Sequence, residues 1–286
     1  MPATTHEFTT EDREYLRHGD KPLKLRHFRP RGDGPFPAVI ELHGGAWCNG
    51  DLTECQIYAE AFARAGLVVL AIDFRHAGDG YPTSNIDINY ATRWVKANAA
   101  QLGTRADLIG MAGQSSGGHL AMLAAMRPAD PRYAALPLPA GAPAVDASVG
   151  AVAMLWPVIN PLSRYNHARR ARDSANPPPW VGNIPERHDL YWKTTANMAD
   201  GNPMLALERG EKVQLPPTLW LQGRPDPVHD YRDPDAPIPG NEPERFVANY
   251  RKAGGDITLL QVEMAARQQE ATLAQVAAFF HQHLRA

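Results

Sequence analysis

The stretch DLIGMAGQSSGGHLAMLAAM, Asp107 to Met126, decides the fold class. Its first six residues form a short apolar run that is typical of a buried strand, and Leu120 to Met126 has the character of a helix. Between them lies a glycine-rich turn in which GQSSG (113–117) fits the pattern G-x-S-x-G. A sharp strand-to-helix turn of this kind strains the backbone of its serine and presents the serine Oγ at the carboxyl edge of a sheet.

Ser115, and not Ser116, is the expected nucleophile of this turn. The residues two before and two after Ser115 are glycines, which lets strand and helix approach closely, whereas Ser116 has Gln114 two residues before it. The first amides of the helix would also stabilise an oxyanion that develops on a bound carbonyl group. The alternative, a chance glycine-rich turn, is disfavoured by the strand–turn–helix context.

Apolar runs of strand length alternate with amphipathic segments along the rest of the chain. This alternation predicts an α/β fold with a mostly parallel central sheet that is flanked by helices on both faces. The expected strands are 23–28, 38–42, 67–73, 149–158, 218–222 and 257–262, and the expected helices are 58–65, 87–100, 242–253 and 271–284.

The domain organisation follows from the segments that do not fit this alternation. Residues 1–22 are interpreted as a loosely attached lead-in with one short helix, and 23–286 as a single domain. Residues 159–203 contain the sequence NPPPW, several aromatic residues and short helical pieces. They are too long for a simple crossover between strands, so we expect a small cap over the carboxyl edge of the sheet.

Composition and charge exclude several classes of protein. The chain has 286 residues, a net charge of −2 and a mean hydropathy of −0.39, so it lacks the basic field of a nucleic-acid-binding protein. Its longest apolar run, Gly66 to Ile72, is too short to span a bilayer. The N-terminus is polar and acidic, unlike a signal peptide, and we therefore expect a cytoplasmic protein without membrane association.

The sequence contains no signature of a cofactor or a metal site. No phosphate-binding loop or dinucleotide fingerprint occurs, so no cofactor is expected. Cys48 and Cys55 are interpreted as reduced thiols. The acidic run from Asp226 to Asp235 is interpreted as a solvated loop, with binding of a stray cation as the alternative. The expected partner is a small molecule, and a homodimer stays open.

A second motif, HGGAW (43–47), directly follows the buried strand at 38–42. Glycines allow a backbone to turn its N–H groups toward one point. The amides of Gly44, Gly45 and Ala46, together with the amide of Ser116, are the candidate oxyanion hole. His43 is interpreted as a brace for this loop, since the loop needs backbone donors and not a base.

These motifs resemble those of one superfamily. The ordered set HGGAW, DFR (73–75), GQSSGGHL (113–120) and LPPTLWLQGRPD (215–226) is similar to the α/β-hydrolases, in particular to carboxylesterases of the hormone-sensitive-lipase-like and feruloyl-esterase-like branches. The resemblance covers residues 23–284. It implies that Ser115 is the nucleophile and Asp226 the acid of a catalytic triad, with a turn residue as the alternative reading of Asp226.

The histidine of the triad is missing from its expected place. In the family it follows the last strand, but residues 263–270 contain none, and Arg267 or Gln268 stands at the corresponding position. Neither side chain can act as a base. By location, His229 is the best substitute, with a surface histidine as the alternative. We expect His76 near the rim, His119 as support behind the elbow, and His167 and His188 in the cap.

The sequence also suggests a substrate pocket and a reaction. Its candidate wall is Trp47, Trp156, His188 and Trp192, with simple packing of the cap as the alternative. The favoured function is hydrolysis of a small carboxylic ester through an acyl-enzyme. Three alternatives stay open: cleavage of an N-formyl amide, because HGG-x-W resembles arylformamidases; a binding protein without turnover; and an engineered variant of an active parent.

Overall fold

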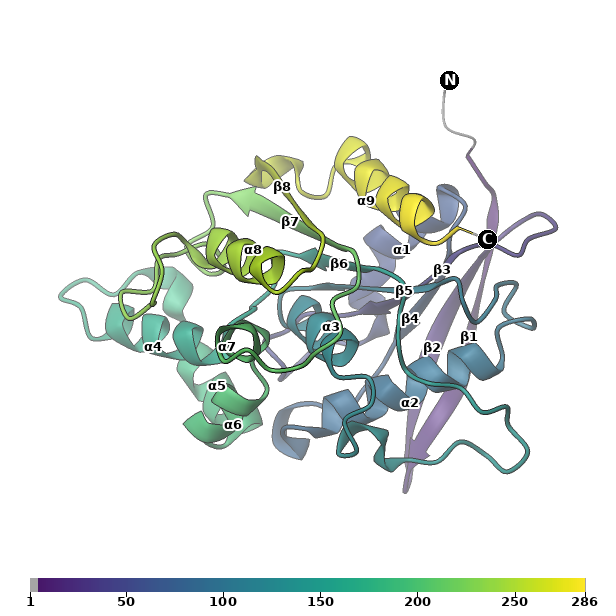
Figure 1. The fold of residues 1–286 in the computed structure, drawn as a ribbon, viewed down its shortest axis with the longest axis horizontal. Helices are drawn as coiled ribbons and strands as arrows, with labels where there is room; N and C mark the ends of the chain where they lie inside the picture. The colour runs from purple at the N-terminus through teal and green to yellow at the C-terminus, as the bar shows by residue number, and fades with distance from the viewer. Residues whose placement is uncertain (1–4, 286) are drawn as a thin grey trace.

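A computed structural model describes residues 5–285, and its centre is an eight-stranded sheet in the order β1-β2-β4-β3-β5-β6-β7-β8 (Figure 1). From β4 to β8 all neighbouring strands are parallel, whereas β1 and β2 are antiparallel to their neighbours. The strands are β1 Phe8–His18, β2 Lys21–Pro30, β3 Ala38–Leu42, β4 Val68–Ile72, β5 Ile109–Gln114, β6 Val152–Leu155, β7 Thr218–Arg224 and β8 Ile257–Glu263.

Helices cover both faces of this sheet, as the alternation of the sequence predicts. The strands β3 and β4 are buried along their whole length, because each of their faces packs against helices. One core lies beneath α1 Gln56–Arg64 and α9 Glu270–His283. The other lies beneath α2 Thr83–Ala97, α3 Ser116–Met126 and α8 Glu242–Lys252.

The first strand differs from the prediction of a loosely attached lead-in. Residues 1–4 lie outside the described part of the chain, but Phe8–His18 pairs with Lys21–Pro30 as a full edge strand and not as a short helix. The prediction fails because this strand exposes most of its polar side chains. Tyr15 is its one buried residue, and its hydroxyl donates to the carbonyl of Asp73 at 2.5 Å.

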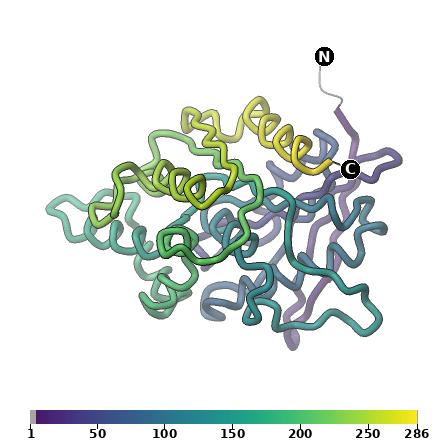
Figure 2. Tube along the Cα trace, in the orientation of Figure 1, coloured from purple at the N-terminus to yellow at the C-terminus, as the bar shows by residue number. Residues whose placement is uncertain are grey.

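The segment between β6 and β7 is helical and gathers at one end of the molecule, beyond the carboxyl ends of the strands (Figures 1 and 2). It contacts the loop after β7, because His167 of α4 lies 3.1 Å from the carbonyl oxygen of Pro227. We call this segment the cap. Its helices are α4 Pro161–Arg172, α5 Ile184–Trp192, α6 Thr195–Asp200 and α7 Pro203–Glu208.

Candidate active site

The turn between β5 and α3 holds Ser115 with a φ of 52° and a ψ of −117°, in a region that side chains rarely adopt. Its glycines are required by close backbone contacts. A Cβ on Gly117 would lie 2.2 Å from the carbonyl oxygen of Leu42, and one on Gly113 would lie 2.4 Å from the carbonyl oxygen of Gly117. The G-x-S-x-G pattern therefore reflects steric need, and it fixes the serine at the carboxyl edge of the sheet.

Three side chains from two loops form one hydrogen-bonded chain at this edge. Ser115 Oγ lies 3.0 Å from Nε2 of His229, and Nδ1 of the same ring lies 2.8 Å from Oδ2 of Asp226. If Nδ1 carries the proton and donates it to Asp226, Nε2 is free to accept the proton of the serine hydroxyl. This arrangement has the geometry that a general base needs toward a serine nucleophile.

The carboxylate of Asp226 shapes the loop that brings His229 to the serine. Its Oδ1 accepts hydrogen bonds from the amides of Val228 and His229 at 3.1 and 3.2 Å, so the chain curls back over the carboxylate. From β7, Gln222 donates to Oδ2 at 3.3 Å, and the Gln222 side chain in turn accepts from Trp220 at 3.1 Å. The orientation of the acid is thus fixed from both sides.

Burial and neighbouring charges set the protonation of this pair. Burial by itself would raise the pKa of Asp226, but the hydrogen bond and charge of His229 and the two backbone amides outweigh it, and the pKa is lowered. Burial lowers the pKa of His229, and the charges of Arg164 and Arg267 lower it further against the opposing effect of Asp226. At neutral pH the site therefore holds a carboxylate beside a neutral imidazole.

The HGGAW loop lies directly against the elbow. A Cβ on Gly44 would be 3.5 Å from the Cβ of Ser115, and one on Gly45 would collide with the carbonyl oxygen of Asn49 at 1.9 Å. Ala46 also has a positive φ, of 51°. His43 stacks on Phe74 with ring centres 4.2 Å apart, as expected for a bracing residue. This side chain is buried, and burial lowers its pKa to about 4.

In the loop after β8, the side chains of Arg267 and Gln268 contact aromatic residues and not Ser115. The guanidinium carbon of Arg267 lies 4.3 Å from the ring centre of Trp156, and the side-chain amide of Gln268 donates to the hydroxyl of Tyr58. His229 from the loop after β7 contacts Ser115 instead.

Three of the four candidate pocket residues pack against one another, and the fourth lies at the carboxyl edge of the sheet. The side chains of Trp47, His188 and Trp192 are each at most 1% exposed. The ring centres of His188 and Trp192 lie 5.0 and 5.3 Å from that of Trp47. This contact favours the alternative of simple packing for all three. Trp156 follows β6 at the carboxyl edge, near the elbow, and Arg267 covers its ring.

The remaining histidines have structural partners. His119 lies behind the elbow, where Nδ1 accepts from the indole of Trp47 at 3.2 Å and Nε2 donates to the carbonyl of Gly201 at 2.7 Å. His167 stacks on Tyr231 with ring centres 3.9 Å apart. His76 makes an edge contact with the ring of His43, with centres 5.8 Å apart.

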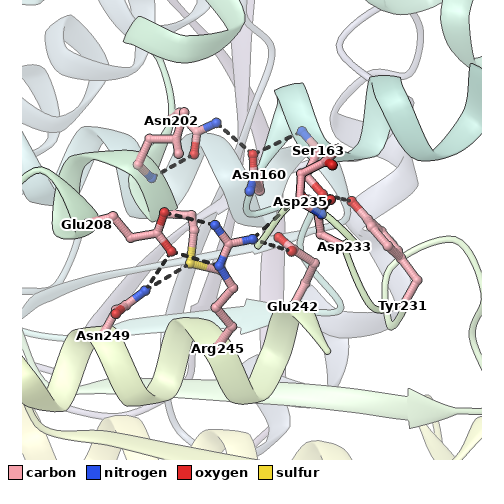
Figure 3. A network of polar contacts seen from close by, with 12 residues as sticks. Asn160, Ser163, Asn202, Glu208, Tyr231, Asp233, Asp235, Glu242, Arg245 and Asn249 are labelled. Carbon is pink, nitrogen blue, oxygen red and sulfur yellow. Dashed lines mark hydrogen bonds and ion pairs between the residues drawn. The ribbon is translucent and has the colours of Figure 1, made fainter. Parts of the chain in front are cut away.

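A buried polar network behind the His229 loop joins the cap to α8 (Figure 3). Arg245 donates to Glu208 of α7 at 2.7 and 2.8 Å and to Glu242 at 3.0 Å. Tyr231 from the loop after β7 donates to Ser163 of α4 at 3.2 Å. No motif in the sequence indicates this network, because its members come from four separate segments.

Arg164 and Gln222 were also missed by the sequence analysis. Arg164 is one of four arginines on α4, and it alone among them is buried, so only the packing of the cap distinguishes it. Gln222 occupies the last part of an apolar strand, where a polar residue was a weak signal for a contact beyond the strand end. Within residues 5–285 no three His, Cys, Asp or Glu side chains gather as a metal ion requires.

Residues 27–232 match the BD-FAE family, which is most of the chain. The chain belongs to the BD-FAE family. Similar curated proteins from Mycobacterium tuberculosis carry the names Probable carboxylic ester hydrolase LipM and Esterase LipC. The first is 30% identical over 68% of this chain and 42% of its own length, and the second 38% identical over 48% and 36%. This BD-FAE chain therefore spans less than half the length of these two relatives.

Solved structures of esterases share the fold of this BD-FAE protein. The thermophilic carboxylesterase EstE1 from a metagenomic library superposes with a TM-score of 0.72 at 21% identity, covering 99% of this chain and 92% of the other. A bacterial heroin esterase has a TM-score of 0.72 at 19% identity, with 98% and 85% covered. The fold is that of an α/β-hydrolase. None of the helices within residues 5–285 combines the length and apolarity needed to cross a bilayer.

Proposed function

We propose that this protein is a serine hydrolase that cleaves a small carboxylic ester through an acyl-enzyme on Ser115. The observation that carries the proposal is the contact of 3.0 Å between Ser115 Oγ and His229 Nε2, continued by the contact of 2.8 Å to Asp226. Curated relatives of the family that are named esterases and carboxylic ester hydrolases support the reaction class.

Each group has one role in this mechanism. Ser115 Oγ attacks the ester carbonyl while His229 Nε2 takes its proton, and Asp226 stabilises the imidazolium that forms. The amides of Gly45, Ala46 and Ser116 hold the oxyanion, with Gly44 shaping their loop. His229 then gives the proton to the departing alcohol, and a water molecule releases the acid by the same steps in reverse order.

The geometry weakens one rival hypothesis and does not distinguish the other. The main support for a binding protein without turnover was the missing base, and a histidine within hydrogen-bond distance of Ser115 weakens that support. Cleavage of an N-formyl amide would use the same groups, so it is compared directly by adding an N-formyl-arylamine to the assay described next.

The test is hydrolysis of p-nitrophenyl acetate and butyrate by the wild type and by Ser115→Ala and His229→Ala. Loss of the nucleophile or the base of a serine hydrolase costs on the order of 10⁶ in kcat. We expect losses of this size in both variants and an unchanged rate in His283→Ala, which alters a histidine on α9.

A fluorophosphonate provides a second readout of the same proposal. We expect one covalent adduct on Ser115 of the wild type, identified by peptide mass spectrometry, and none on Ser115→Ala. Hydrolysis that persists in Ser115→Ala, or an adduct on a different residue, would falsify the proposal.

A further inference from the structure

The loop between β8 and α9 places an arginine at the active edge of the sheet. The Arg267 guanidinium lies over the ring of Trp156, at 4.3 Å from its centre. Trp156 follows Leu155, whose carbonyl accepts a hydrogen bond from the amide of Ser115 at 2.9 Å. A Cβ on Gly223, near the end of β7, would lie 3.4 Å from Arg267 Cδ. Arg267 therefore covers the ends of β6 and β7, beside the elbow.

No carboxylate of the described residues pairs with this guanidinium. Within residues 5–285 Arg267 forms no ion pair and its side chain donates no hydrogen bond to the protein, and its stacking on Trp156 leaves its N–H groups free. The neighbouring Arg224, in contrast, is paired with Asp230 and Glu244. The half-buried Arg267 is therefore available to an anion that enters the site.

A second arginine contributes positive charge from the cap. Arg164 is 4% exposed and belongs to the same tightly packed group of side chains as His229, with no space between them for a water molecule. Its Nε and Nη1 have no hydrogen-bond partner among the described residues. Of the nearby carboxylates, Asp226 is engaged by His229, and burial raises the pKa of Glu242 to about 7, so part of its charge is absent at neutral pH. Arg164 and Arg267 thus bring two positive charges toward the base, and the carboxylate of Asp226 is already bound to His229.

The position of the base indicates which part of a substrate meets this charge. His229 must return its proton to the departing alcohol, so the alcohol part of a bound ester lies against the imidazole. Arg267 lies at this same edge of the sheet, over the ring of Trp156, whose neighbour Leu155 accepts the hydrogen bond from the amide of Ser115. An anionic group on the alcohol part would therefore approach Arg267.

We propose that Arg267 is a specificity-determining residue that binds a carboxylate on the alcohol part of the ester, so that the preferred substrates are small acyl esters of hydroxy acids. A planar guanidinium binds a carboxylate through two parallel hydrogen bonds, and the Trp156 ring holds the guanidinium from behind. This inference rests on the proposed function, because it names the substrate class of the same site.

The test compares 4-acetoxybenzoate with 4-acetoxybenzamide, two esters of nearly the same shape that differ in charge. We expect the wild type to favour the anionic ester in kcat/KM. In Arg267→Gln the ratio of the two kcat/KM values should fall about tenfold, which corresponds to the loss of about 1.4 kcal/mol from one charge-assisted contact. Arg267→Lys should recover part of the ratio because it keeps the charge.

The matched control is Arg105→Gln, which removes the same charge from an exposed loop before β5, at the opposite edge of the sheet. It should keep the wild-type ratio, as a general charge effect would not. A ratio in Arg267→Gln within twofold of the wild type overturns the inference.

Binding to Ser115→Ala separates this inference from the proposed function. By calorimetry, this variant should bind 4-acetoxybenzoate more tightly than 4-acetoxybenzamide, and the difference should disappear in Ser115→Ala/Arg267→Gln. Equal binding of the two esters to Ser115→Ala counts against the carboxylate site alone. Tight binding of the anionic ester with no turnover by the wild type counts against the proposed hydrolysis alone.

Discussion

His229 is surrounded by charges that oppose one another. Asp226 favours the protonated imidazole, whereas burial and the charges of Arg164 and Arg267 favour the neutral one, and the neutral form wins because the pKa is lowered. A base must be neutral to accept a proton, so, with His229 as the proposed base, we expect activity above its pKa and loss of activity below it. The lowered pKa thus extends activity toward acidic pH.

The pH profile tests this balance. We expect the acidic limb of kcat/KM to have its midpoint below about 6.5, the usual pKa of histidine. In Arg164→Gln the midpoint should move to higher pH, because removal of a nearby cation favours the imidazolium. Arg105→Gln is the control for loss of charge, and circular dichroism checks folding. A midpoint that stays in place or moves to lower pH in Arg164→Gln would contradict this account.

At this scale the sequence supplies the nucleophile, the oxyanion loop and the acid as predictions, because each lies within a local pattern. His229 could be chosen only by its location. Its approach to Ser115 depends on the curl of the loop over Asp226 Oδ1, which sequence spacing alone does not fix. Arg164 had no pattern to indicate it, since its role depends on burial. The spacing of the family placed Arg267 where the histidine is expected, but its stacking on Trp156 could not be predicted.

Among the elements, the elbow between β5 and α3 leaves no room for a side chain at its glycines. Gly117→Ala would place a methyl group 2.2 Å from the Leu42 carbonyl oxygen and 2.5 Å from that of His43, and both atoms belong to the backbone. We expect a loss of about 1–3 kcal/mol in the free energy of unfolding, the usual cost of overpacking, measured in urea. A Cβ at Gly78 meets nothing within 4 Å, so Gly78→Ala should change little. Equal stability of the two variants would refute the steric argument.

The elements themselves were predictable to different degrees. Buried strands such as β3 and β4 were found because they are continuous apolar runs between turn residues. The edge strand β1 was missed because its sequence, FTTEDREYLRH, buries almost no apolar surface. Its backbone hydrogen bonds are made with β2, and no sequence pattern indicates this pairing. The cap was located by exclusion, because its sequence does not fit the alternation of strands and helices in the rest of the chain.

For the whole molecule, the network around Arg245 ties the cap to the sheet domain. Arg245 is 3% exposed and pairs with both Glu208 and Glu242, so Arg245→Ala would leave two carboxyl groups of the network without their cation. We expect a loss of about 3–5 kcal/mol in the free energy of unfolding in urea. Arg17→Ala breaks the exposed pair with Glu14, and it should change the free energy of unfolding little because solvent screens this pair. Similar losses in both variants would argue against a role for the network in holding the cap.

The short distance in sequence between Asp226 and His229 has a consequence for the division of labour in this fold. Asp226 and His229 share one tight loop and are joined by a side-chain contact of 2.8 Å and a hydrogen bond of 3.2 Å to the backbone, whereas their approach to Ser115 is a contact between two separate loops. The proposed acid and base therefore form one local unit of the chain. The loop after β8, where the family keeps its histidine, is thereby free of that role and holds Arg267 against Trp156 instead.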